Sequence, residues 1–279
     1  MSEGYAHPRA LVDTRWLARR LNDPRLAVVE ADVDASIYQR GHIPGSVLWD
    51  LFKDLADPLT RDIPSPSAME ELLSRSGIGN DTTVVLYGDG KNRSATWAFW
   101  LLKHYRHRDV RILNGGRQKW LAEGRPLSQD APPRPRAGYV VGVPAPSLRA
   151  TRDYILARLG RPGFAPLDTR SREEFMGVDH PDHPQTGIQR LGRLPGAVHL
   201  EWDEAAAFDD TFLPAQRLRE MYQRLGLTPD KEVVTYCRLG VRASYSWFVL
   251  KHLLGYPRVR NYDGSWTEWG NLVGVPIER

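Results

Sequence analysis

The 279-residue chain is poor in cysteine, in long apolar runs and in net charge. Its single cysteine excludes a disulfide within the chain and any zinc or iron–sulfur site built on several thiolates. The longest aromatic and aliphatic run, at 97–102, is far shorter than the roughly 20 residues that a bilayer requires. With 38 basic and 34 acidic residues the formal net charge is only +4, and the arginines are scattered. We therefore expect no membrane anchor, no nucleic-acid partner, no metal and no cofactor.

The remaining composition is that of an ordinary globular protein. Hydrophobic residues make up 41% of the chain and charged residues 26%, a balance that excludes a disordered chain. At roughly 150 residues per domain, this length corresponds to about two domains. The first residues, MSEGYAHPRA, lack the basic, apolar and small-residue pattern of a signal peptide, so we expect a cytoplasmic location.

The chain repeats itself. The segment GHIPGSV at 41–47 recurs as GRLPGAV at 192–198. Tyr87, which ends an apolar run, recurs as Tyr236 at a distance of 149 residues (236 − 87), and a tryptophan near the end of each half keeps the same spacing. Matches in the same order along both halves indicate a tandem duplication of one module.

A proline-rich stretch separates the two copies. Residues 124–150 contain six prolines, each of which lacks an N–H group and fixes φ. Such a stretch can form neither a helix interior nor a central strand, so we predict a semi-rigid surface linker. The predicted first domain is then 1–138 and the second is 139–279.

Short apolar runs alternate with helical segments in each copy. In the first copy we predict strands at 26–30, 83–87 and 110–113, helices at 94–106 and 117–122, and a further helix opened by a capping box at Ser67. In the second copy we predict strands at 165–168 and 232–236 and helices at 215–225 and 243–254. This alternation is typical of an α/β fold in which a mostly parallel sheet has helices on both faces. Ligands of such sheets bind beyond the carboxyl ends of the strands.

The only cysteine lies at such a strand end. Cys237 directly follows the strand predicted at 232–236 and opens the loop CRLGVR, which runs into the next helix. Backbone N–H groups of a short loop before a helix can cradle an anion, and the positive end of the helix favours a thiolate. Arg238 and Arg242 favour both a thiolate and an incoming oxyanion. We therefore predict that Cys237 is a nucleophile that acts on an anionic substrate.

The first copy has no such nucleophile. Gly88 stands where Cys237 stands in the second copy, and an acidic residue, Asp89, follows it. The string at 88–91, GDGK, lacks the spacing of a phosphate-binding loop. We expect the first domain to be catalytically inactive and to bind no nucleotide.

These features resemble the tandem-domain rhodanese family, the thiosulfate sulfurtransferases, and in particular a bacterial group whose loop reads Cys-Arg-x-Gly-x-Arg. The resemblance covers nearly the whole chain, including the His/Arg-x-Pro-Gly turn of both copies and the segment NYDGSWTEWG at 261–270. It implies that only the second domain is active, that Cys237 forms a persulfide and that Arg242 contacts the substrate. The predicted substrate-binding residues are Arg238, Leu239, Gly240, Val241 and Arg242, and the predicted supporting residues are Asp168, Arg170 and Trp266.

The reaction implied by the resemblance has two displacements on small-molecule substrates. The Cys237 thiolate attacks the outer sulfur of thiosulfate and expels sulfite, and cyanide or a thiol then attacks the persulfide. Arg238 favours a sulfonate-bearing donor, whereas Leu239 departs from the best-known loop, in which two basic residues follow the cysteine. Two alternatives stay open. The donor could be 3-mercaptopyruvate, or the chain could be a persulfide carrier that serves a protein partner.

Other cysteine chemistries fit less well. Cysteine-dependent phosphatases place five residues between Cys and Arg and a histidine before the cysteine, whereas here four residues intervene and Tyr236 precedes. A papain-like site needs a paired histidine, and the histidines of this chain are mostly isolated. His180 and His183 lie together in an insertion that the first copy lacks, and we interpret them as surface residues rather than metal ligands.

Overall fold

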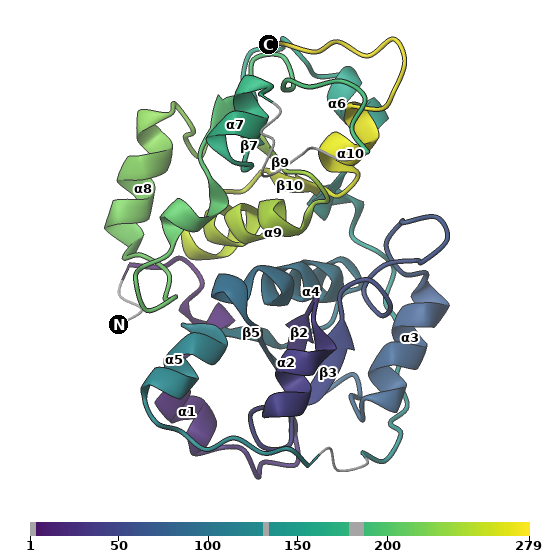
Figure 1. The fold of residues 1–279 in the computed structure, drawn as a ribbon, viewed down its shortest axis with the longest axis vertical. Helices are drawn as coiled ribbons and strands as arrows, with labels where there is room; N and C mark the ends of the chain where they lie inside the picture. The colour runs from purple at the N-terminus through teal and green to yellow at the C-terminus, as the bar shows by residue number, and fades with distance from the viewer. Residues whose placement is uncertain (1–3, 131–133, 179–186) are drawn as a thin grey trace. The chain divides into compact units, whose positions relative to one another are not determined.

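The computed structural model describes residues 4–130, 134–178 and 187–279, which form two compact units (Figure 1). The N-terminal unit contains the described residues of 9–145 together with 206–212. The C-terminal unit contains those of 4–8, 146–205 and 213–279. Each unit has its own sheet.

The N-terminal unit is built on a five-stranded parallel sheet in the order β1-β5-β4-β2-β3. Its strands are β1 (Leu11–Val12), β2 (Leu26–Asp32), β3 (Val47–Asp50), β4 (Thr83–Tyr87) and β5 (Val110–Leu113). Its α-helices are α1 (Thr14–Ala18), α2 (Ala35–Arg40), α3 (Pro66–Arg75), α4 (Arg93–His104) and α5 (Gly116–Ala122).

The C-terminal unit repeats this topology in the order β6-β10-β9-β7-β8. Its strands are β6 (Arg149–Ala150), β7 (Phe164–Asp168), β8 (Val198–His199), β9 (Glu232–Tyr236) and β10 (Val259–Tyr262). Its α-helices are α6 (Arg152–Leu156), α7 (Arg172–Met176), α8 (Ala215–Arg224), α9 (Val241–Phe248) and α10 (Ser265–Trp269). Two parallel sheets with the same strand order confirm the predicted fold class.

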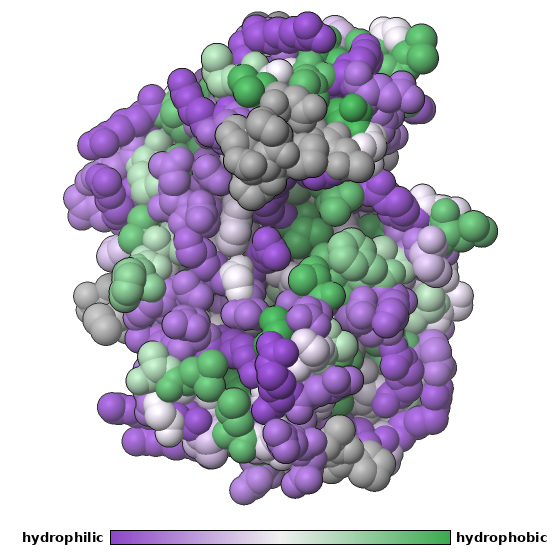
Figure 2. Space-filling view, viewed as in Figure 1, coloured by the Kyte–Doolittle hydropathy of each residue, from purple (hydrophilic) through white to green (hydrophobic). Residues whose placement is uncertain are grey.

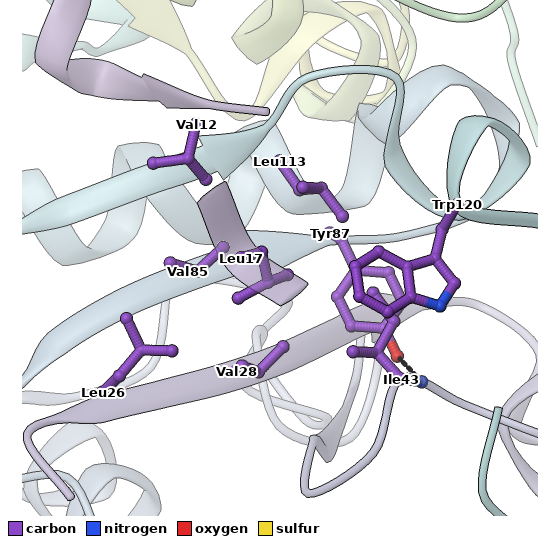
Figure 3. Close-up of a cluster of buried hydrophobic side chains, with 9 residues drawn as sticks. All are labelled: Val12, Leu17, Leu26, Val28, Ile43, Val85, Tyr87, Leu113 and Trp120. Carbon is purple, nitrogen blue, oxygen red and sulfur yellow. Dashed lines mark hydrogen bonds between the residues drawn. The ribbon is translucent and has the colours of Figure 1, made fainter. Parts of the chain in front are cut away.

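Apolar side chains from strands and helices form the core on one face of the N-terminal sheet (Figure 3). Val28 of β2 and Val85 of β4 pack there with Leu17 of α1 and Trp120 of α5, and all of them are at most 2% exposed. Because side chains alternate along a strand, the residues between them face the other side of the sheet. Helix α4 packs there, across β2, β4 and β5.

Two sequence predictions need correction. Helix α3 begins at Pro66, and its N-cap is Ser65, whose Oγ accepts from the N–H of Ala68 at 3.2 Å. Ser67 therefore does not open this helix. The first turn of a helix leaves its N–H groups unpaired, so the missing N–H of proline costs nothing there and the helix can begin at Pro66. The C-terminal unit also differs from expectation, since the helix predicted at 243–254 begins at Val241 and continues as a π-helix over Val249–Leu253.

The described residues of the proline-rich stretch up to Ala145 belong to the N-terminal unit. Ser128 and His42 exchange backbone hydrogen bonds of 2.8 Å in each direction, and the N–H of Ala145 donates to the carbonyl of His104 at 2.8 Å. The last two residues of the stretch, Arg149 and Ala150, are not part of a linker, however, because they form β6 and pair with β10. The last proline is Pro146, so the N–H groups needed for that pairing are present.

The surface seen in Figure 2 is mainly hydrophilic, with apolar residues in small groups. Leu59, Phe208 and Val273 are among the exposed apolar side chains. In the described part of the chain, none of the helices has the length and apolar character needed to span a bilayer.

Candidate active site

Cys237 lies at the carboxyl end of β9, the central strand of the C-terminal sheet. The residue is only 1% exposed, and the backbone N–H of Gly240 donates to its Sγ at 3.1 Å. Gly240 is the N-cap of α9 and has a φ of +84°, which L-residues with a side chain rarely adopt. The loop thus turns a backbone N–H group toward the sulfur.

The segment before and within α10 holds this loop in place. The Oγ of Ser265 accepts from the N–H of Cys237 at 3.1 Å, and the carbonyl of Cys237 accepts from the N–H of Trp266 at 2.9 Å. Asn261 Nδ2 donates to the carbonyl of Gly240 at 3.2 Å. The sequence reasoning missed Ser265 and Asn261, although both belong to the quoted segment at 261–270.

The other loop residues are only partly buried. The backbone carbonyl of Arg238 accepts from the N–H of Thr267 at 3.0 Å and from its Oγ1 at 2.6 Å, which fixes the loop directly after the cysteine. Leu239, Val241 and Arg242 have intermediate exposure, as does Arg238 itself. The predicted substrate-binding residues therefore lie together around Cys237, each with some surface except Gly240.

Arg242 forms an ion pair that the sequence reasoning missed. Its Nη1 donates to Glu174 Oε2 at 2.7 Å and its Nη2 donates to Oε1 at 2.9 Å. Burial disfavours the charged guanidinium, but the hydrogen bonds that it donates to Glu174 and the nearby negative charges outweigh burial and raise the pKa of Arg242. Burial likewise opposes ionisation of Glu174, and the ion pair lowers the pKa of this carboxyl overall. Both groups are therefore charged at neutral pH.

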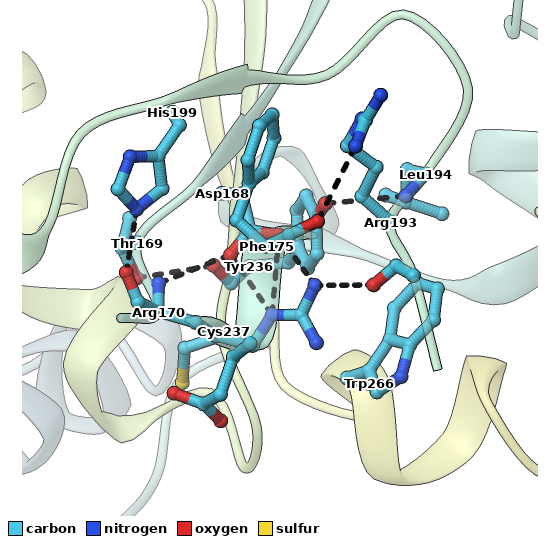
Figure 4. Close-up of polar contacts among 12 residues, drawn as sticks. Asp168, Thr169, Arg170, Phe175, Arg193, Leu194, His199, Tyr236, Cys237 and Trp266 are labelled. Carbon is cyan, nitrogen blue, oxygen red and sulfur yellow. Dashed lines mark hydrogen bonds and ion pairs between the residues drawn. The ribbon is translucent and has the colours of Figure 1, made fainter. Parts of the chain in front are cut away.

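Beneath the loop lies a second ion pair, between Asp168 and Arg170 (Figure 4). Arg170 Nε and Nη2 donate to the two carboxylate oxygens at 3.0 and 2.6 Å, and both side chains are 0% exposed. Burial disfavours the charged Arg170, but Asp168 outweighs burial and raises the pKa of the guanidinium. With no exposed surface, the two residues brace the end of β7 and offer nothing that a substrate could touch.

Trp266 belongs to the same buried layer. Its side chain is 0% exposed, and the guanidinium carbon of Arg170 lies 4.5 Å from the centre of its ring. Burial raises the pKa of Tyr236 well above its ordinary value, and the Asp168 charge adds to that shift. Trp266 therefore supports the loop through its backbone and the buried layer through its ring.

The N-terminal unit contains a similar buried pair, whose carboxylate is at the equivalent strand position but whose arginine comes from a different element. Arg117 Nη1 donates to Glu30 Oε1 at 3.0 Å, and its Nη2 donates to the carbonyl of Gly41. In the C-terminal unit, Arg170 Nη2 donates to Gly192, which the repeat aligns with Gly41. Arg117 lies 149 residues before Trp266 (266 − 117), so the repeat aligns it with a tryptophan rather than with Arg170.

Gly88, at the position of the cysteine, has no room for a side chain. A Cβ built there would clash with the backbone oxygen of Ala31, and the N–H of Gly88 already donates to Asn92 Oδ1 at 3.0 Å. We expect Gly88→Cys to destabilise the protein by about 1–3 kcal/mol through overpacking and to form no persulfide.

This prediction is checked in a Gly88→Cys/Cys237→Ser double variant by intact mass after incubation with thiosulfate and by thermal unfolding. The wild-type protein is the positive control for sulfur loading. If the double variant gained a sulfur atom, the prediction would be wrong, and the loop of the first domain would be able to support persulfide formation.

The histidines considered as a metal site, His180 and His183, lie outside the described residues. Within 4–130, 134–178 and 187–279, no three His, Cys, Asp or Glu side chains gather in a way that could hold a metal ion.

Fold and site together define a class of protein. The protein has two copies of a parallel α/β module. Only in the second copy does a cysteine open the loop that follows the central strand. The match to the rhodanese-like domain family covers residues 13–123 and 151–272, and the chain belongs to that family. The resemblance inferred from the sequence is thereby confirmed.

Two relatives of the chain are named as a sulfur carrier and as a sulfurtransferase. The chain is 50% identical over 281 residues to the sulfur carrier protein TtuD of Thermus thermophilus, covering 99% of both chains. It is 45% identical over 275 residues to the "Putative thiosulfate sulfurtransferase" of Mycolicibacterium smegmatis, covering 98% of this chain and 99% of that protein.

Among solved structures, the chain is similar to the anaerobic ergothioneine biosynthesis enzyme of Chlorobium limicola in complex with trimethyl histidine. The TM-score is 0.86 at 27% identity, over 98% of this chain and 71% of that chain. A cysteine-persulfide form of the enzyme EanB with ergothioneine aligns with a TM-score of 0.85, again at 27% identity and over 98% and 71% of the two chains. These relatives support a sulfurtransferase.

Proposed function

We propose that this protein moves the sulfane sulfur of thiosulfate to cyanide or another thiophilic acceptor through a persulfide on Cys237. The observation that carries the proposal is the contact between Gly240 N–H and Cys237 Sγ at the end of β9. A backbone N–H fixed by a left-handed glycine stabilises negative charge on the sulfur before and after it reacts. The second domain is then the catalytic one, and the first is inactive.

The reaction has two balanced steps. The Cys237 thiolate attacks the outer sulfur of thiosulfate, a new S–S bond forms, and sulfite leaves with the electron pair of the old one. Arg238 and Arg242 belong to the loop and stabilise the charge that develops on sulfite. Cyanide then attacks the outer sulfur of the persulfide, thiocyanate leaves, and the thiolate is restored. No general base is needed, because the thiolate is itself the nucleophile.

Intact-mass measurement tests this cycle directly. We expect the wild-type protein to gain one sulfur atom after thiosulfate and to lose it after cyanide, because the persulfide is the only covalent intermediate. Cys237→Ser serves as the matched control and should gain nothing. If thiosulfate left the wild-type mass unchanged, 3-mercaptopyruvate would be the donor to try, and failure of both donors would overturn the proposal.

A persulfide carrier is the second candidate, and the similarity to the sulfur carrier protein TtuD favours it. The loop chemistry is the same, and the two functions differ only in the acceptor. A fast turnover with cyanide or small thiols supports the enzyme. A persulfide that stays on Cys237 with those acceptors and discharges only to a protein thiol supports the carrier.

A further inference from the structure

The guanidinium of Arg242 is occupied before any substrate binds. Glu174 accepts from both terminal nitrogens, at 2.7 and 2.9 Å, in a bidentate pair. The two side chains are 21% and 15% exposed, so water screens this pair less than it screens a surface ion pair. An anion that approaches Arg242 must share the guanidinium with Glu174 or displace it.

Glu174 is held in this position by hydrogen bonds with Ser171, the N-cap of α7. It lies in the first turn of α7, where its Oε2 accepts from the N–H of Ser171 at 3.0 Å and its N–H donates to Ser171 Oγ at 3.3 Å. This capping box fixes the carboxylate independently of Arg242. Displacing Glu174 would therefore break a helix cap as well as an ion pair.

The charge of Arg242 also acts on a second carboxyl group, that of Glu201. Burial raises the pKa of Glu201, and the charge of Arg242 opposes that shift. Arg242 thus interacts electrostatically with Glu201 as well as with Glu174.

We infer that Glu174 is a specificity-determining residue that weakens the binding of dianionic sulfur donors by occupying Arg242. This inference rests on the proposed function. Coulomb energy is proportional to the product of the charges, so partial neutralisation of Arg242 costs a dianion such as thiosulfate about twice what it costs a monoanion such as 3-mercaptopyruvate. The ion pair thereby shifts the preference of the site toward donors of lower charge.

Glu174→Gln is the variant that tests this inference. Glutamine at this helix position also completes a capping box, so the substitution removes the charge but keeps the local fold. We expect KM for thiosulfate to fall by about tenfold with kcat changed less than about twofold, and KM for 3-mercaptopyruvate to fall by only about threefold. The difference between the donors should shrink at about 1 M salt, where the screening length is about 3 Å.

Two control variants separate the charge effect from other causes. Ser171→Ala removes the hydroxyl that accepts from the N–H of Glu174 but keeps the backbone N–H that donates to the Glu174 carboxylate, so the ion pair and KM for thiosulfate should be unchanged. Asp153→Asn removes one negative charge from an exposed pair with Arg152, and should also leave it unchanged. In a Cys237→Ser background, where no chemistry occurs, calorimetry should show the Glu174→Gln change as tighter thiosulfate binding.

The outcomes separate this inference from the proposed function. If thiosulfate loads Cys237 but Glu174→Gln leaves KM and the calorimetric Kd unchanged or raises them, the inference is wrong and the proposed function stands. If neither donor places sulfur on the wild-type protein, the proposed function is wrong and the inference falls with it. Equal effects on both donors would also contradict a role in charge discrimination.

Discussion

Cys237→Ser is expected to lower kcat/KM for thiosulfate by about 10⁵ or more, the loss typical of removing a catalytic nucleophile. A serine hydroxyl stays protonated at neutral pH and cannot carry a sulfur atom as a persulfide. The fold should persist, because serine is slightly smaller and its Oγ can accept from the N–H of Gly240, which lies 3.1 Å from the sulfur. Thiocyanate formation from thiosulfate and cyanide measures the activity, and thermal unfolding measures the fold.

Thiocyanate formation and the unfolding temperature together decide whether Cys237 is the nucleophile. A variant with a normal unfolding temperature and no thiocyanate formation identifies Cys237 as the nucleophile. Activity within about tenfold of the wild type would exclude that role, since a tenfold loss corresponds to only about 1.4 kcal/mol.

Asp168→Ala is expected to lower the free energy of unfolding by about 3–5 kcal/mol. Arg170 is 0% exposed and uses two nitrogens to bind the Asp168 carboxylate, so the substitution leaves a buried cation without its counter-charge. Urea unfolding followed by fluorescence measures the loss in the nine-tryptophan chain.

The exposed pair of Arg152 and Asp153 provides the matched control. The Asp153 side chain is 77% exposed, so Asp153→Ala should cost no more than about 1 kcal/mol. If Asp168→Ala also cost less than about 1 kcal/mol, the buried pair would not brace β7 as described.

Much of the fold could be predicted because the same alternation of apolar runs and helical segments occurs in both copies. The strands predicted at 83–87, 110–113 and 232–236 correspond to β4, β5 and β9. Short helices were missed, among them α2 and α7, with six and five residues. A helix of one or two turns shows too little periodicity to be recognised, and its N-cap residue is then the only local signal.

The position of Cys237 could be predicted from the sequence, but its surroundings could not. A strand end before a helix is visible in the residues themselves, whereas Arg242 and Glu174 are 68 residues apart. The capping box of Ser171 and Glu174 could have located the helix. It could not have shown that the same carboxylate also binds an arginine across the site, because that contact depends on tertiary packing.

The buried guanidiniums limit how the two modules can be recombined. Arg117 comes from α5 in the N-terminal unit, and Arg170 follows β7 in the C-terminal unit. A hybrid module with β7 and its following loop from one copy and α5 from the other would bury two arginines against one carboxylate. The reciprocal hybrid would bury an acid with no arginine. We expect exchange of these single elements to fail, because each module takes its buried arginine from a different element.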